Sequence, residues 1–233
     1  MPHPRLTGAS ILFLIAVARS TAAGQNIPSP YAFIENSQAW EVFGGKANLD
    51  PGQLGLGPRD ATVAGGGYGV AFAGAMNLDI GGTMFLSMRE VLDVSAPVDD
   101  RSLGRTDINV LLVDVRLRLN LTGQRTWHRL QPFIVFGGGV AFTTFTDRTL
   151  ELLSEMPRDQ WYEFGTRFAA TLGAGTVIHV SRKISLRVDG VMNLWKIQTP
   201  VGWRTIAADP LGENIDSEWV NPSTIRVGVA WRF

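Results

Sequence analysis

The stretch that decides the fold is Ser223-Thr-Ile-Arg-Val-Gly-Val-Ala-Trp-Arg-Phe233. From Ile225 to Phe233 every second residue is apolar. The residues between them are charged or small: Arg226, Gly228, Ala230 and Arg232. A repeat of two residues places alternate side chains on opposite faces of a β-strand. The stretch therefore predicts a strand with one apolar face and one polar face.

The opposite end of the chain predicts export. The chain begins with a short segment, residues 1–5, that ends with the cation Arg5. An unbroken apolar run follows at residues 9–18, and residues 20–24 have small side chains. The run is too short for a membrane-spanning helix, which needs about 20 residues. A cleaved secretory signal peptide fits this pattern better. We predict a signal peptide over residues 1–23, with cleavage after Ala23.

Composition restricts the function. The chain has 21 basic and 21 acidic residues, and removal of Arg5 and Arg19 with the signal would leave a slightly acidic protein. This balance does not suggest a nucleic-acid partner. The absence of cysteine excludes disulfides and thiolate zinc sites. We predict no cofactor and no metal site.

Eight segments beyond the signal have strand length and no competing helical pattern. They are residues 39–47, 65–77, 79–91, 106–121, 132–146, 164–180, 183–198 and 224–233. Most reach the roughly 9–11 residues that a tilted strand needs to cross a membrane. The remaining N-terminal segment, residues 24–38, is expected to lie in the periplasm, and residues 39–233 are expected to form the barrel domain.

Segment 183–198 shows the alternation most clearly. Its even-numbered residues from Ile184 to Leu194 are apolar or Gly, whereas the other face carries Arg187, Asp189 and Asn193. In a soluble sandwich the apolar face would form the core. In a membrane barrel it would face lipid, with the charges inside. Alternation alone does not separate these two interpretations.

The connections favour the membrane barrel. Long gaps at residues 48–64, 92–105, 147–163 and 199–223 alternate with short gaps near residue 78 and at residues 122–131 and 181–182. Short periplasmic turns and long external loops are typical of a transmembrane barrel. We therefore predict an all-β fold, an eight-stranded antiparallel up-and-down transmembrane β-barrel, with a soluble β-protein as the alternative.

The segments Gln131-Pro-Phe-Ile-Val-Phe-Gly-Gly-Gly-Val-Ala-Phe142 and Lys183-Ile-Ser-Leu-Arg-Val-Asp189, with the closing strand, resemble the small bacterial outer-membrane β-barrel superfamily. That group includes the OmpA transmembrane domain, OmpX, opacity-type barrels and OmpW. The resemblance implies that Phe233 is read by the barrel-assembly machinery. It also implies outer-membrane lipids as partners, and roles in envelope integrity, adhesion or small-solute passage.

An eight-stranded barrel has an interior filled by side chains. We expect its lumen to hold a structural or gating network of charged residues, because buried ions must be paired. The candidates are Glu41, Arg89, Asp114, Arg116, Arg118, Arg187, Asp189 and Arg226. Trp40, Trp195 and Trp231 are expected at the membrane interface, where amphipathic aromatic rings gather.

Three functions remain open. A structural or surface-interaction barrel, adhesion-like and with an external ligand for its long loops, comes first. A narrow channel for small or apolar solutes comes second. A lipid A-modifying enzyme comes third, suggested by His179-Val-Ser181, the spacing of a deacylase-type pair. The motif falls at a predicted periplasmic turn, away from outer-leaflet substrate, so we expect no catalytic residues.

Overall fold

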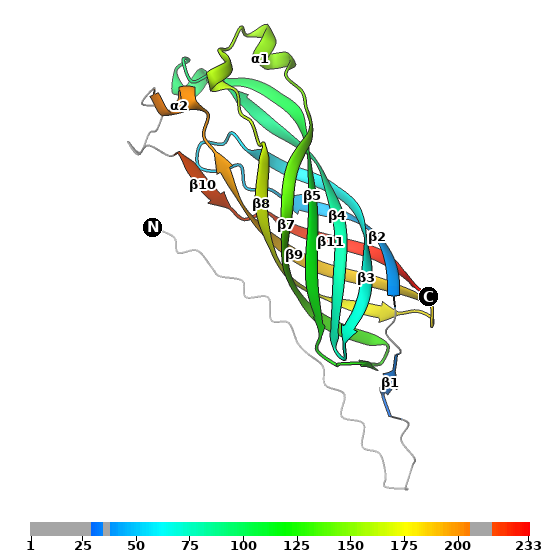
Figure 1. Ribbon diagram of the computed structural model, residues 1–233. Helices are drawn as coiled ribbons and strands as arrows, with labels where there is room; N and C mark the ends of the chain where they lie inside the picture. Colours follow the sequence, from blue (N-terminus) through cyan, green and yellow to red (C-terminus); the bar gives the residue numbers. More distant parts are fainter. Residues whose placement is uncertain (1–28, 35–37, 206–215) are drawn as a thin grey trace, which may run out of the picture.

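The computed structural model describes residues 29–34, 38–205 and 216–233, and Figure 1 shows an elongated barrel of tilted strands. The predicted signal peptide and its cleavage site lie outside these residues. The barrel consists of eight long strands: β2 (Gln38–Asn48), β3 (Pro58–Ala73), β4 (Met76–Leu92), β5 (Ser102–Asn120), β7 (Leu130–Thr146), β8 (Thr166–His179), β9 (Ile184–Gln198) and β11 (Ser223–Arg232).

The strands form a closed antiparallel ring. Each strand pairs with its sequence neighbour among the eight, and β11 closes the ring on β2 with registers from Ser223↔Asn48 to Arg232↔Ala39. This closure pairs the two edges that an open sheet would leave exposed. The predicted eight-stranded up-and-down barrel is therefore confirmed.

Short elements lie at both ends of the barrel. At one end are the helices α1 (Thr149–Leu153), α2 (Val201–Thr205), η1 (Val98–Asp100) and η2 (Arg158–Gln160), with β10 (Ser217–Val220) paired antiparallel to β9. At the other end β1 (Tyr31–Phe33) pairs with β6 (Arg125–Trp127) inside the β5–β7 connection. We call the first end extracellular and the second periplasmic, which is the orientation that the loop asymmetry predicts.

Two strand boundaries differ from the sequence prediction. The β3–β4 hairpin turns at Gly74 and Ala75 rather than near Leu78, because Gly74 adopts a positive φ of 52° that suits a tight turn. The strand β3 begins at Pro58 instead of Gly65, so the first external loop is shorter than expected. An irregularity in pairing between Pro58 and Ala61 interrupts the alternation there.

The two faces of the wall change polarity along the barrel axis. Toward the periplasm the outward face is apolar, with Ile184, Leu186 and Val188 exposed, and the inward face holds Arg187 and Asp189. Toward the extracellular end the order reverses. There Lys46 and Asp107 point outward, whereas Val63, Phe85 and Val110 are buried inside. The apolar outer band therefore ends below the extracellular rim, and the barrel continues beyond it.

No helix among the described residues is long and apolar enough to cross a membrane.

The first prediction concerns the lipid-facing side of β9. Val188 lies midway along the apolar outward row of this strand and is 38% exposed in the isolated chain. Val188→Arg is expected to lower the free energy of unfolding by about 2–4 kcal/mol, as a midplane arginine does in other barrels. Urea unfolding in lipid vesicles measures the loss. Val188→Leu is the control, and an Arg variant as stable as the Leu variant would show that the lipid face is misassigned.

Candidate functional site: three layers of side chains in the lumen

The middle of the lumen is filled by a connected cluster of ions. Arg187 contacts Glu41 at 2.8 Å, Asp189 at 2.9 Å and Asp79 at 3.4 Å. Asp189 also binds Arg226 at 2.7 Å, and the guanidinium of this arginine donates two hydrogen bonds to the carboxylate. The side chains of Arg187 and Asp189 are each only 2% exposed, so their charges are neutralised inside the wall.

Aromatic rings complete the surroundings of these arginines. The guanidinium carbon of Arg187 lies 4.6 Å from the ring centre of Phe133, and that of Arg226 lies 4.6 Å from the ring centre of Phe43. Such cation–π contacts add to the stabilisation of a buried cation.

Two of the expected residues form a separate pair. Arg116 lies 3.3 Å from Asp114, and Thr171 donates a hydrogen bond to the other oxygen of Asp114 at 3.2 Å. No ion pair within 4 Å joins this pair to the larger cluster among the described residues. Arg118 does join the larger cluster, through Asp79 at 3.4 Å.

Glycines make room for these side chains. A Cβ added at Gly139 would lie 2.7 Å from the Cβ of Asp114, and one added at Gly175 would lie 2.5 Å from the Cβ of Asp189. Gly81 likewise faces Arg116. Small residues on one strand therefore complement bulky charged residues on its neighbours, which is what a filled eight-stranded interior requires.

Arg89 does not belong to the central cluster. It points inward from β4, but near the extracellular end, where it pairs with Glu151 of α1. Both side chains are almost fully buried, at 2% and 1% exposure, and Arg148 approaches the same carboxylate at 3.3 Å. The pair attaches the α1 loop to the barrel rim. The prediction that Arg89 belongs to the charged network of the lumen is therefore wrong.

An apolar cluster closes the extracellular end of the lumen. Strand residues such as Val63, Phe85 and Ile108 pack there with Tyr162 of the β7–β8 connection and Trp203 of α2. Burial of aromatic and aliphatic side chains is the main favourable term in folding such a cap. The cap resembles the core of a soluble barrel, placed above the ionic layer.

Trp195 belongs to this cap and not to the membrane interface. Its side chain is 1% exposed, and its ring meets Phe85 and Phe164 edge-on at 5.7 and 5.6 Å. Its predicted interface position is therefore wrong. Trp40 and Trp231 do face outward, at 60% and 62% exposure, and lie opposite each other across β2 and β11 near the periplasmic end.

Tyr162 provides a prediction for the cap. Burial raises the pKa of its phenol well above the usual value, and its hydroxyl has no hydrogen-bond partner among the residues that the structure describes. Because the folded state resists ionisation, stability contributed by the neutral phenol is present below pH 10 and is lost as pH rises beyond it. Tyr162→Phe is expected to remove the most alkaline step from the phenolate absorbance titration and to lessen alkaline unfolding. An unchanged titration would contradict a buried phenol.

At the periplasmic end a chain of hydrogen bonds joins β11, β8 and β7. Arg232 donates to Nδ1 of His179 at 2.6 Å, so Nε2 carries the ring proton and donates to Gln131 at 3.1 Å. Gln131 in turn donates to the carbonyl of Gly123. Ser181 accepts backbone hydrogen bonds from Lys183 and Ile184 in the turn. Both ring nitrogens are thus engaged in structural bonds away from Ser181, which gives no support to a catalytic pair.

Sequence reasoning missed Asp79, which links Arg187 to Arg118. It also missed Glu151, the partner of Arg89. Asp79 was placed beside a predicted turn, and Glu151 lies in a loop where alternation gives no signal. No group of His, Asp and Glu within the described parts of the chain is arranged to hold a metal ion.

No family model matches the chain, and no curated protein matches it. Solved structures do resemble it. The outer membrane protein OprG from Pseudomonas aeruginosa has 13% identity and a TM-score of 0.53, with 86% of this chain and 98% of that chain covered. Neisserial surface protein A has 11% identity, coverage of 88% and 98%, and a TM-score of 0.48.

The attachment invasion locus protein Ail of Yersinia pestis, in complex with the heparin analogue sucrose octasulfate, has 11% identity and a TM-score of 0.42. The match covers 85% of this chain and all of that chain. At these identities the likeness concerns the fold alone, and it is the match to OprG that supports it. The chain therefore has the fold of the small bacterial outer-membrane β-barrel proteins.

Proposed function

We propose that the protein is a closed outer-membrane barrel with a structural and surface-interaction role, and that it does not conduct solutes. The observation that carries this proposal is the apolar cluster across the extracellular end of the lumen. It lies above the ionic layer formed around Arg187, so a solute would have to displace two different kinds of packing.

The extracellular end supports the interaction role. The strands continue beyond the apolar outer band and carry α1, η2, α2 and β10 on a packed base. Leu152 and Leu153 of α1 are 63% and 76% exposed, and Trp219 of β10 is 62% exposed. Exposed apolar side chains on a rigid support are suited to contact with an external surface.

Two experiments test the proposal. The purified barrel in a planar bilayer is expected to show no steady conductance, and a stable open channel would overturn the closed lumen. Cells that display the Leu152→Asp and Leu153→Asp double variant are expected to adhere less to host-matrix or abiotic surfaces than cells with the wild-type protein. Glu155→Gln in the same loop is the control, and equal adhesion of all three would overturn the interaction role.

The proposal includes a processed, exported chain. Cleavage after Ala23 is expected to leave a mature N-terminus at Gly24, which N-terminal sequencing of outer-membrane material would identify. Deletion of Phe233 is expected to impair assembly and leave protease-sensitive protein in the periplasm.

A further inference from the structure

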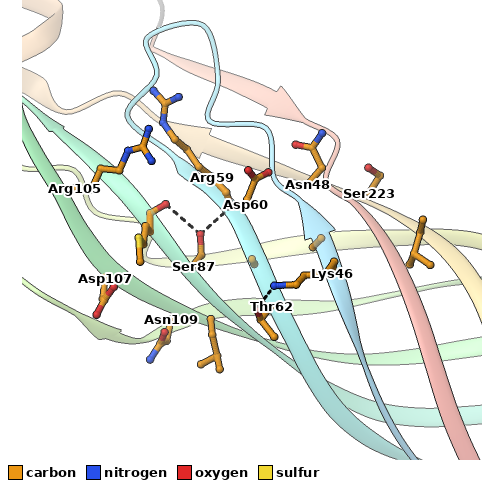
Figure 2. A pocket seen from close by; sticks show the side chains of 15 residues that line it. Lys46, Asn48, Arg59, Asp60, Thr62, Ser87, Arg105, Asp107, Asn109 and Ser223 are labelled. Carbon is orange, nitrogen blue, oxygen red and sulfur yellow. Dashed lines mark hydrogen bonds between the residues drawn. The ribbon is translucent and has the colours of Figure 1, made fainter.

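A polar groove crosses the outer surface of the barrel just above the apolar band. It has a volume of about 990 Å³ and is formed by the outward side chains of β11, β2, β3, β4 and β5. Figure 2 shows Lys46 and Thr62 on neighbouring strands, with Arg105, Asp107 and Asn109 following one another on a third.

Strand register explains how these residues meet. One row across the sheet reads Ile225, Lys46, Thr62, Leu86 and Asn109, each opposite the next in the ladder. The row therefore mixes apolar side chains with a cation, a hydroxyl and an amide. Such a mixture marks the level at which acyl chains give way to headgroups in a membrane.

The next row outward is more polar. It contains Ser223 opposite Asn48, and Met88 opposite Asp107. Arg105 follows at the rim, opposite Glu90. The groove thus has an apolar floor made by Leu86 and Met88 and a polar border toward the extracellular side.

The charged groups of the groove have unused bonding capacity. Lys46 donates a single hydrogen bond, to Thr62 at 2.8 Å, and Arg105 has no side-chain hydrogen bond or ion pair with any described residue. Arg59, in contrast, is already paired with Glu90 at 2.6 Å. Cations that lack a carboxylate partner attract phosphate groups. A carboxylate accepts hydrogen bonds from sugar hydroxyls, and an amide both accepts and donates them.

The spacing of Lys46 and Arg105 restricts the ligand further. They are separated by three strand spacings, about 14 Å across the sheet, and Arg105 lies four residues beyond the row of Lys46, about 13 Å along the strand. Together these place the two Cα atoms about 19 Å apart. One phosphate is too small to meet both side chains over that distance, so the geometry suits two anionic groups carried by one headgroup.

We propose that the groove binds a phosphorylated glycolipid of the outer leaflet. Its acyl chains would lie on Leu86 and Met88, one phosphate would meet Lys46 and a second would meet Arg105. Asp107 and Asn109 would bind sugar hydroxyls between the two phosphates. The site depends on the position of the barrel in the outer membrane but not on whether its lumen is closed.

Lipid binding to the purified, detergent-folded barrel tests the proposal. The probes are diphosphoryl lipid A, monophosphoryl lipid A and phosphatidylglycerol, with affinities measured by native mass spectrometry. The wild-type protein is expected to bind diphosphoryl lipid A most tightly. Lys46→Ala and Arg105→Ala are each expected to weaken that binding about five- to tenfold, the effect of one charge-assisted contact at a partly exposed site.

Binding of monophosphoryl lipid A is expected to be weakened by only one of the two substitutions, because one phosphate is absent. Lys196→Ala is the control, since Lys196 points outward from β9 outside the groove. The unboiled fast-migrating gel band verifies that each variant is folded. Equal binding of lipid A and phosphatidylglycerol, or Lys46 and Arg105 variants that behave like the Lys196 variant, would overturn the proposal. Full sensitivity of monophosphoryl lipid A to both substitutions would overturn the two-phosphate arrangement.

Discussion

Asp189→Ala is expected to lower the free energy of unfolding by about 3–5 kcal/mol, because it leaves buried cations without their partner. The carboxylate of Asp189 contacts both Arg187 and Arg226, whose side chains are 2% and 4% exposed. Neither guanidinium can turn to solvent from the middle of the lumen. Urea unfolding in lipid vesicles, followed by tryptophan fluorescence and by loss of the fast-migrating gel band, measures the change.

Matched variants separate charge from volume. Asp189→Asn keeps the size of the side chain and one acceptor oxygen, so it is expected to cost less than Asp189→Ala. The double variant Asp189→Asn with Arg226→Gln removes one positive and one negative charge together, and its cost should be smaller than the sum of the single costs. Arg182→Ala in the exposed periplasmic turn is expected to change stability by less than about 0.5 kcal/mol. Asp189→Ala with an equally small effect would contradict a closely paired lumen.

The sequence predicted the faces of the strands well. On β9 the even-numbered residues are outward and Arg187 and Asp189 are inward, as the alternation indicated. The reason is geometric, since a strand of period two has no other way to place its side chains. The number of strands followed from the same pattern, because each segment between turns was long enough to cross a membrane.

Strand ends were less predictable. The extracellular part of β3 has its apolar residues Ala61 and Val63 inside and its polar residues Asp60 and Thr62 outside, the reverse of the membrane part. Because the apolar residues change faces along this strand, next to an irregular pairing at Pro58, the sequence shows no continuous alternation there. The segment was therefore predicted as a loop. The turn at Gly74 was missed because residues 76–78 continue the alternation of β4.

The candidate site shows the same limit. Alternation gives the face of a strand on which a side chain lies, but not its level along the barrel axis. It therefore misplaced Arg89 and Trp195, both in their level and in the residues around them. Arg89 reaches a loop carboxylate that no strand pattern reveals, and Trp195 enters an apolar layer that the ionic residues below it did not suggest. The level of a side chain in the lumen depends on the register between neighbouring strands, and that register is known only once the strands are paired in the closed ring.

Trp195→Ala distinguishes the two placements of this side chain. As part of the cap it is expected to lower the free energy of unfolding by about 3–5 kcal/mol, the cost of removing a buried aromatic ring and leaving a cavity. Its ring lies between Phe85 and Phe164, so both edge-on contacts would be lost. The cavity would also lie directly in the path through the lumen.

Trp231→Ala is the matched control, because Trp231 faces outward at 62% exposure and leaves no internal cavity when it is shortened. Urea unfolding of the two variants in the same vesicles is expected to show a much larger loss for Trp195. Bilayer recordings of the Trp195 variant add a second readout, since the ionic layer around Arg187 lies below the cap and should still prevent conductance. Equal losses of unfolding free energy for the two variants would contradict the place of Trp195 in the cap and favour the membrane interface. A conducting Trp195 variant would show that the cap alone closes the barrel.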